Sequence, residues 1–439
     1  MTNEAPVRND KRTIFGWAMY DWANSAYITI FGAVIGAFFT GTIMTGDTYW
    51  GMSGEALFSI LIGLGSIILL LVMPILGAVA DYTNAKRRFL RNFAFVGAAF
   101  AVLIAFVPDG QVPLFLIIVV VSQFGFVAAN VFYDGFLPEI ASDDTIDQVS
   151  SKGFALGYLG GGLYLLFALV LIMFSSDDPN AALNETFAAR ISIFGAGIWW
   201  AVFSLYSLAK LPADATSGAS RSLGEYASIG FSRTIETMRK LRDFPQLLMF
   251  VVAFIIYNSG IGTVIAISGP YAEDTLGLEL ETIALAFLIV QFIAVGGAFM
   301  LGALAKAIGP KRSVLITLVV WVGVAVMAYF IPEGGATSFL ALAAVIGFVL
   351  GGVQALSRSL YGTMIPEEAS AEFFGFYSVF SKLSGIGPLI FGLVSATTGS
   401  GRTAILSIAL FFIIGLILLA RVNVDEARAS RDQWDFETV

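Results

Sequence analysis

Long apolar runs separated by short polar segments divide this chain, and they decide what it can fold into. Of its 439 residues, 57% are hydrophobic and only 13% are charged. A soluble domain is about half apolar and about a quarter charged, so the shortage of charge is the larger departure. Because about 20 apolar residues in a helix span the core of a bilayer, the sequence predicts an all-helical integral membrane protein.

Hydropathy predicts twelve membrane-spanning helices, six on each side of a polar break. The predicted spans are 14–43, 56–80, 90–107, 112–134, 153–174, 192–209, 246–269, 282–305, 313–331, 338–363, 372–397 and 402–422. The break predicts four segments, namely an N-terminal six-helix bundle over 1–209, a cytoplasmic linker over 210–245, a C-terminal six-helix bundle over 246–422 and a cytoplasmic tail over 423–439.

A short phrase recurs half a chain apart. Gly77-Ala-Val-Ala-Asp81 precedes Lys86-Arg87, and Gly302-Ala-Leu-Ala-Lys306 precedes Lys311-Arg312. Further matches occur in the same order, such as Asn24-Ser25 with Asn258-Ser259. An internal repeat in an apolar chain predicts two pseudo-symmetric bundles related by an axis along the membrane normal, as in many secondary transporters.

Lysine and arginine placement predicts the orientation. Of the 24 basic residues, only Arg190 and Arg402 fall in segments assigned to the outer side. Because cytoplasmic loops carry the excess of positive charge, both termini are expected in the cytoplasm, and the protein in the inner (plasma) membrane.

Several classes of function lack the residues they need. The chain contains no cysteine and no histidine, which excludes disulfides, thiolate chemistry, histidine–metal sites and Ser–His–Asp catalysis. A net charge of −8 argues against nucleic acid as a partner. No phosphate-binding glycine loop is present. We expect a non-enzyme without cofactor or metal, a monomer whose partners are the lipid bilayer and a small-molecule substrate.

The linker contains Leu223, Tyr226, Ile229, Ile235, Met238 and Leu241 at helical spacing, with basic residues between them. This pattern predicts an amphipathic helix. Such a helix lies either on the membrane surface or against the end of the bundle, and the sequence leaves both alternatives open.

Polar side chains within the predicted spans gather on a few helix faces. Because they are costly in a bilayer, they usually face the bundle interior or a path for a solute. The predicted substrate-binding or coupling residues are Asp21, Asn24, Ser25, Asn130, Asp134, Asn258, Ser259, Gln354, Arg358 and Lys382. The alternative is that some of them only hold helices together.

The charges within the predicted spans divide between the halves. The acids Asp21 and Asp134 lie in the first half, and the bases Arg358 and Lys382 lie in the second. We hypothesise that acid–base pairs form between the halves when the cytoplasmic side closes, and separate when it opens. The alternative is that each charge extends to the nearby interface.

The repeated phrase also has a local interpretation. Glycines allow helices to approach closely, and Asn84 and Gly309 are residue types that tolerate a left-handed backbone at a helix end. We expect gating residues at Gly77, Asp81, Arg87, Gly302, Lys311 and Arg312. The alternative, a basic turn that only sets orientation, does not explain the matching glycines.

The order Gly77, Asp81, Asn84, Lys86 and Arg87 resembles the signature of the major facilitator superfamily, departing from it at Tyr82 and Asn84. Four further segments resemble its vacuole-effluxer-like branch, relatives of the fungal vacuolar amino-acid effluxer: Tyr20–Ala26, Ser151–Tyr158, Gly352–Leu360 and Glu372–Tyr377. The resemblance implies the major facilitator fold and rocker-switch alternating access. It also implies a gate between the signature acid and the start of span eleven, and in the second copy Lys306 replaces that acid.

These observations predict a secondary active transporter of a small polar solute. Acids opposite bases suit a zwitterion such as an amino acid, although the same charges can pair with each other. Asp21 is the preferred residue for proton coupling, because a carboxyl group in a partly desolvated site binds a proton more readily. The alternatives are an exporter of drugs or other metabolites, and a non-transporting membrane sensor or scaffold on the same fold.

Overall fold

The computed structural model describes residues 8–46, 48–52, 54–176, 178, 180–214, 223–382 and 386–434. Nearly all of these residues are helical, and the described part contains no strand, only two isolated bridges, Tyr49–Met52 and Ser176–Asn184. The predicted all-helical class is therefore confirmed. It follows from the apolar runs, because a helix satisfies its own backbone hydrogen bonds where no water can do so.

The helices of the first half follow the predicted spans closely. Their bounds are α1 Lys11–Ile30, η1 Phe31–Ile35, α2 Gly36–Phe38, η2 Phe39–Ile43, α3 Gly54–Tyr82, α4 Lys86–Ile104, α5 Val112–Gly135, α6 Leu137–Ile140, α7 Ile146–Met173 and α8 Glu185–Lys210. The segments from α1 to η2 form one continuous helical stretch, in which η1 and η2 are π-helical. Polar caps start two of these helices: Asp10 accepts from the Thr13 N–H and Asn184 from the Phe187 N–H.

The second half repeats this arrangement. Its elements are α10 Pro245–Pro270, η4 Tyr271–Thr275, α11 Leu280–Ile308, α12 Pro310–Phe330, α13 Ala336–Gly362, η5 Glu367–Ala369, α14 Ser370–Lys382, α15 Ile386–Thr398 and α16 Gly401–Arg421. Between the halves lie α9 Leu223–Lys240 and η3 Leu241–Asp243, and after them come α17 Val424–Ser430 and η7 Arg431–Gln433. The predicted eleventh span corresponds to α14 and α15.

Among the described residues, nine helical segments are long and apolar enough to cross a membrane. They are Lys11–Ile43, Val112–Ile140, Ile146–Met173, Glu185–Lys210, Pro245–Thr275, Glu281–Ile308, Pro310–Phe330, Ala336–Gly362 and Gly401–Arg421. Shorter apolar stretches fall in α3 and in α15. The protein is thus a multi-pass membrane protein, whereas the exact number of twelve spans stays a prediction.

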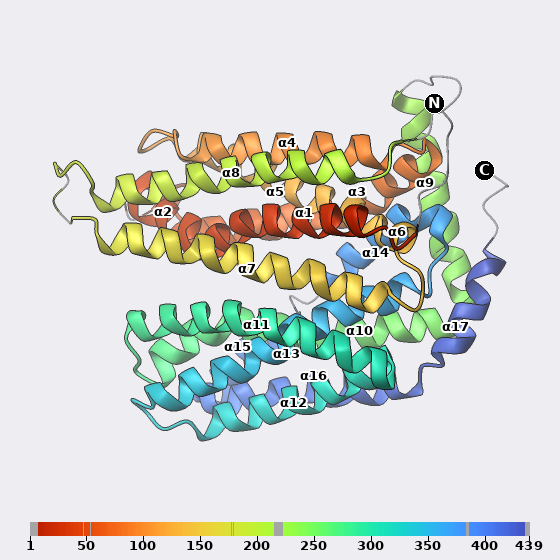
Figure 1. Ribbon diagram of the computed structural model, residues 1–439. Helices are drawn as coiled ribbons and strands as arrows, with labels where there is room; N and C mark the ends of the chain where they lie inside the picture. Colours follow the sequence, from red (N-terminus) through yellow and green to blue (C-terminus); the bar gives the residue numbers. More distant parts are fainter. Residues whose placement is uncertain are drawn as a thin grey trace.

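Two bundles of roughly parallel helices lie side by side (Figure 1). One hydrophobic core is formed by residues of α1 to α8 together with Ala371, and the other by residues from Leu247 to Trp434. The helices α8 and α10 end and begin beside the predicted boundaries at 209/210 and 245/246. That these segments are separate domains stays a prediction.

The linker helix α9 lies across the end of the bundles, near α17 (Figure 1). At Gly230 its backbone lies so close to α3 that an added Cβ would meet the Ile75 carbonyl oxygen at 2.8 Å. Arg233 of α9 forms an ion pair with Glu372 of α14 at 3.6 Å. The structure thus shows α9 packed against the bundle end, and its contact with the membrane surface stays a prediction.

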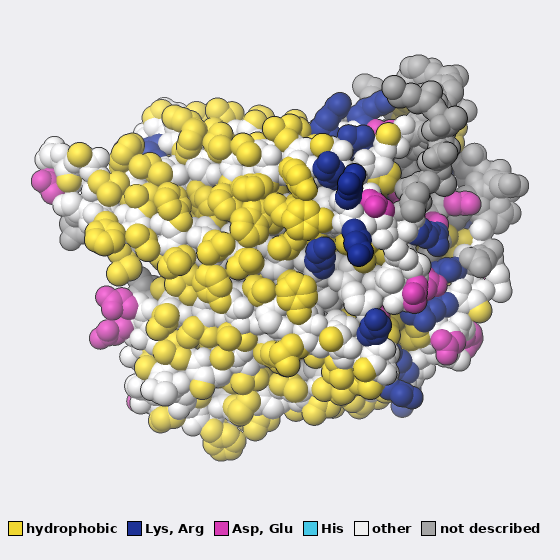
Figure 2. Space-filling model, viewed as in Figure 1, with side chains coloured by type: hydrophobic (Ala, Val, Ile, Leu, Met, Phe, Trp, Pro, Cys, Tyr) yellow, Lys and Arg dark blue, Asp and Glu magenta, His cyan; other side chains and the backbone are white. Residues whose placement is uncertain are grey.

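Basic side chains form a band where the apolar surface ends, on the side of α9 and α17 (Figure 2). We call this end of the molecule, at which α3 ends and α4 begins, the basic end. The two predicted exceptions lie in the bundles away from it. Arg190 binds Asp109 at 2.8 Å, and Arg402 donates to the carbonyl oxygens of Tyr329 and Ile331.

Candidate functional site

Both copies of the repeated phrase end a helix with a positive φ angle. Asn84 follows α3 with a φ of 47°, and Gly309 follows α11 with a φ of 91°. Only glycine, and to a smaller extent asparagine, adopts such a backbone readily. The predicted left-handed helix ends are therefore confirmed at both positions.

The glycine of each copy touches the opposite half. A Cβ added at Gly77 of α3 would overlap the backbone carbonyl of Ala371 in α14. A Cβ added at Gly302 of α11 would overlap the Ser151 hydroxyl of α7. The repeat thus places two matching contacts between the halves at the basic end, α3 against α14 and α11 against α7.

Asp81 caps the start of α14. Its carboxylate accepts hydrogen bonds from the Ala371 N–H at 3.3 Å and from the Glu372 N–H at 2.8 Å. A carboxylate at a helix N-terminus is favoured because the first N–H groups there lack partners within the helix. This is the contact with the start of span eleven that the family resemblance implies.

Lys86 completes this contact; it lies in the repeated phrase and in the signature, but it is not among the predicted gating residues. Its buried ammonium group lies 3.3 Å from Asp81 and 2.5 Å from Glu139, and it donates to the Ser370 hydroxyl at 2.6 Å. The ammonium therefore joins both halves. The neighbouring Arg87, predicted as a gating residue, forms no salt bridge within the described residues and instead lines a cavity beside the start of α4.

The second copy differs in its charges. Lys311 donates to the carbonyl oxygens of Ala420 and Val422 at 2.8 and 2.7 Å, and so binds the end of α16 within its own half. Arg312 and Lys306 are exposed. The gating role of Lys311 and Arg312 stays a prediction. The second copy has Lys306 on α11 where the first has Asp81. An acid of the facing helix, Asp147 of α7, instead accepts a hydrogen bond from the Ser359 hydroxyl at 2.6 Å.

Arg358 is the centre of a polar cluster between the halves. It projects from α13 and is only 3% exposed. Its Nη1 atom lies 3.0 Å from Asp134 Oδ1 and 3.3 Å from Asp21 Oδ2. Its Nε atom donates to the Ser150 hydroxyl, and its Nη2 atom to the Ser150 carbonyl oxygen, both at 3.0 Å. In this structure Arg358 is thus paired with two acids of the other half, and that these pairs separate when the cytoplasmic side opens stays a prediction.

Aromatic rings enclose the guanidinium. Its carbon lies 4.1 Å from the ring centre of Phe154, 4.9 Å from Trp17 and 5.5 Å from Tyr133. The Tyr133 hydroxyl also donates to Asp21 at 2.8 Å. Rings contribute cation–π attraction that strengthens as water is excluded. We call Arg358, Asp21, Asp134, Ser150 and these three rings the Arg358 cluster.

A second polar layer lies about one helical turn, or about 5 Å, further from the basic end. There the Asn24 amide donates to the Asn130 oxygen at 2.7 Å, which joins α1 to α5. The Tyr158 hydroxyl of α7 donates to Gln354 of α13 and so joins the halves. Ser25 faces α7, because a Cβ at Gly157 would meet its hydroxyl at 2.9 Å. We call Asn24, Ser25, Asn130, Tyr158 and Gln354 the polar layer.

The structure does not bring every predicted residue to this region. Asn258 donates to the Ser381 carbonyl oxygen at 3.3 Å, and Ser259 donates to the Ile255 carbonyl oxygen of its own helix. Both of these bonds are local to the second half. The side chain of Lys382 lies outside the described residues.

Three residues of the Arg358 cluster carried a weak signal in the sequence. Ser150 and Phe154 stand at or beside the Ser151–Tyr158 segment, and Tyr133 directly precedes Asp134. Their role depends on side-chain contacts between helices that hydropathy does not register. Among the described residues, no group of three or more acidic side chains could hold a metal ion.

Comparison with known proteins gives a consistent assignment of family. The family model described as "Vacuole effluxer Atg22 like" matches residues 9–432. An uncharacterized MFS-type transporter from Bacillus subtilis, YxiO, is 30% identical over 416 residues, which cover 92% of this chain and 94% of that protein. Autophagy-related protein 22 from Coccidioides immitis is 25% identical over 434 residues, covering 81% of this chain and 70% of that protein.

Solved structures share the architecture. The major facilitator superfamily transporter FucP in the outward conformation superimposes with a TM-score of 0.69 at 15% identity, covering 94% of this chain and 98% of that one. The proton:xylose symporter XylE gives a TM-score of 0.69 at 15% identity, covering 96% and 98%. The similarity shows that this chain has the major facilitator fold.

Proposed function

The chain belongs to the vacuole effluxer Atg22-like family of major facilitator transporters, and from this premise we propose that it is a secondary active transporter. It moves a small polar solute across the membrane by rocker-switch alternating access. The observation that carries the proposal is the Arg358 cluster, in which one buried guanidinium of the second half binds two carboxylates of the first.

The placement of the bonds supports this mechanism. Asp81, Lys86 and Arg358 all join the halves at the basic end, and each bond is charge-assisted. Breaking them exposes Asp21, Asp134 and Arg358 to water, which replaces the lost partners. Closed and open states then differ by a small free energy, as alternating access requires.

The polar layer is the proposed substrate site. Its amide and hydroxyl groups offer both donors and acceptors, and they lie between the Arg358 cluster and the opposite side of the membrane. A zwitterion such as an amino acid matches this chemistry, because its carboxylate suits Arg358 and its ammonium suits Asp21. Drugs and other metabolites are the alternative substrates. They would bind to the same amide and hydroxyl groups.

Proton coupling is part of the proposal. The Arg358 cluster has two carboxylates for one guanidinium, which leaves one formal negative charge in excess. A proton on Asp21 removes this excess and weakens the pairing with Arg358. Proton binding at Asp21 therefore favours separation of the halves.

Flux through the purified protein in lipid vesicles tests the proposal. A thermal-stability screen against metabolites identifies the solute, since a bound ligand stabilises the folded protein. We expect flux of this solute to respond to a pH gradient, and Asp21→Asn to remove the response. Asn130→Ala is expected to raise KM by about threefold to tenfold. The matched control Ser122→Ala, on the same helix but bonded to the Gly97 carbonyl oxygen of α4 outside the polar layer, leaves KM unchanged.

Binding without flux above that of protein-free vesicles would contradict transport and support the sensor or scaffold alternative. Flux that is indifferent to the pH gradient would contradict coupling alone. Within this proposal the protein acts as a monomer in the plasma membrane, with both termini in the cytoplasm and the basic end on the cytoplasmic side. It catalyses no chemical reaction and uses no cofactor.

A further inference from the structure

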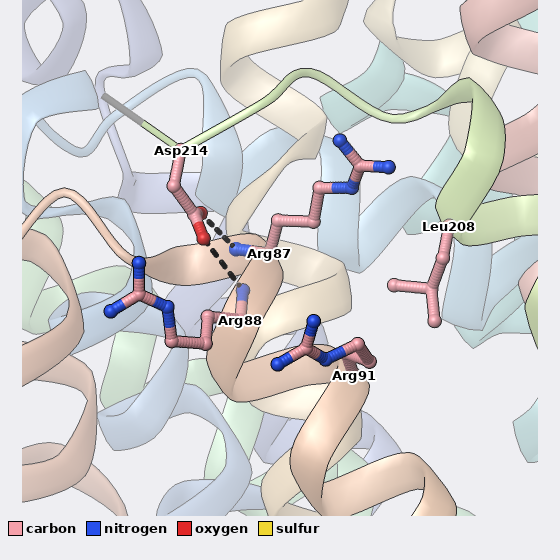
Figure 3. Close-up of a pocket in the computed structure, with 5 residues that line it drawn as sticks. All are labelled: Arg87, Arg88, Arg91, Leu208 and Asp214. Atoms are coloured by element: carbon pink, nitrogen blue, oxygen red, sulfur yellow. Dashed lines mark hydrogen bonds between the residues drawn. The ribbon is translucent and has the colours of Figure 1, made fainter. Parts of the chain in front are cut away.

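A cavity of about 310 Å³ lies at the basic end, where α4 begins beside the end of α8. Arg87, Arg88, Arg91, Leu208 and Asp214 line it. Figure 3 shows the three arginines projecting from the first turns of α4, with the Asp214 carboxylate against the helix end. Neither the Arg358 cluster nor the polar layer includes any of these residues.

The start of α4 already holds an oxyanion. Ala85, the residue before the helix, provides no capping side chain. Asp214, from the segment after α8, supplies the cap instead, accepting from the Arg87 N–H at 2.7 Å and the Arg88 N–H at 3.0 Å. With the backbone donors satisfied in this way, the guanidinium groups remain for a separate ligand.

The cavity carries an excess of positive charge. Within the described part of the chain, none of the three guanidinium groups forms a salt bridge, and Arg91 donates only to the side-chain oxygen of Asn92, at 3.2 Å. One carboxylate therefore faces three permanent cations. Such a group of arginines binds phosphate oxygens through paired, charge-assisted hydrogen bonds.

An apolar surface leads directly from this cavity. On α4, Val96 is 45% exposed and Leu103 is 44% exposed. They follow Arg88 and Asn92 on one helical face, because these positions differ by four or seven residues. On the neighbouring α8, Val202 and Leu205 are 54% and 59% exposed. Figure 2 shows that basic side chains gather where such apolar surface ends.

We propose that this cavity binds the phosphate group of an anionic phospholipid, whose acyl chains lie along α4 and α8. Arg88 and Arg91 bind the phosphate oxygens, and Val96 and Val202 contact the chains. A soluble phosphate ester offers the same charge, but it would leave the adjoining apolar surface unused. The lipid is therefore the occupant that the whole site fits.

Binding of dioctanoyl phosphatidylglycerol to the detergent-purified full chain tests the site. We expect saturable binding that is stronger than that of dioctanoyl phosphatidylcholine. The double variant Arg88→Gln/Arg91→Gln should weaken it about 30-fold, since each basic residue near an anionic lipid contributes about fivefold. The matched control is Arg239→Gln/Lys306→Gln, which removes two exposed basic residues elsewhere.

A second variant moves binding in the opposite direction. Asp214→Asn removes the only carboxylate among the described residues that line the cavity, so it should tighten binding of the anionic lipid severalfold, a gain that misfolding cannot produce. Equal losses in the double variant and in its control would overturn the proposal, because the lipid would then sense only overall charge. Inorganic phosphate or glycerol phosphate binding as tightly as the lipid would overturn it as well.

Discussion

Arg358→Gln is expected to abolish solute flux and to lower the free energy of unfolding by about 3–5 kcal/mol. The substitution leaves Asp21 and Asp134 buried without their cation, and it removes the donors to Ser150. A buried charge without a partner costs more than the pair contributes when complete, because water no longer solvates it. Thermal unfolding and vesicle flux measure the two effects separately.

Two further variants show whether the unpaired carboxylates cause the loss of stability in Arg358→Gln. Arg358→Lys keeps the charge but loses the planar group that binds three partners and stacks on Phe154, so it should restore only part of the stability. Adding Asp21→Asn and Asp134→Asn to Arg358→Gln should restore most of it, since no unpaired charge remains. Arg402→Gln, at the opposite end of the molecule, serves as the control and should cost about 1–2 kcal/mol. Full flux in Arg358→Gln would refute the role assigned to the cluster.

Gly77→Ala should destabilise the closed contact at the basic end by about 1–3 kcal/mol, the usual cost of overpacking. The added Cβ overlaps the Ala371 carbonyl, which is backbone and cannot rotate away. The closed state should become less populated by about fivefold to 150-fold. Accessibility of an introduced cysteine to a water-soluble reagent measures this population. Gly302→Ala should have a smaller effect, because its added Cβ meets the Ser151 side chain.

Each of these glycines has a matched control on its own helix. For Gly65 of α3 and Gly296 of α11, the described part of the chain places no neighbouring atom within 4 Å of an added Cβ. Gly65→Ala and Gly296→Ala should therefore leave the conformational balance unchanged, because alanine favours the helix in all four variants. If Gly65→Ala shifted the balance as far as Gly77→Ala does, close packing at Gly77 would not be the cause.

The sequence predicted most of the fold because bilayer physics is simple. Runs of apolar residues must form helices, so α5, predicted at 112–134, is found at Val112–Gly135. The repeat predicted matching helix ends at Asn84 and Gly309, and both have positive φ angles. Separation of acids and bases between the halves led to the hypothesis of acid–base pairs between them, and the structure pairs Arg358 with Asp21 and Asp134.

Side-chain contacts between helices were beyond this reasoning. Lys86 and Arg87 are adjacent and both basic, and only the rotation of α4 decides that Lys86 faces Asp81 while Arg87 faces the cavity. The packing of α9 against the bundle end depends on the close approach of Gly230 to α3, and hydrophobic periodicity does not predict such a contact. Asn258 and Ser259 match Asn24 and Ser25 in sequence, yet they bind backbone carbonyls within their own half.

Locking the two halves together at the basic end tests alternating access most directly. The chain has no cysteine, so a single introduced pair is unambiguous. A Cβ at Gly135 of α5 would lie 3.4 Å from the Cβ of Ala371 in α14, close to the usual disulfide separation of about 3.5–4.5 Å. In the variant Gly135→Cys/Ala371→Cys, oxidation should stop solute flux and reduction should restore it. In each single variant, neither treatment should change the flux. Solute flux through the fully cross-linked protein at the same rate as through the protein with its disulfide reduced would contradict the mechanism.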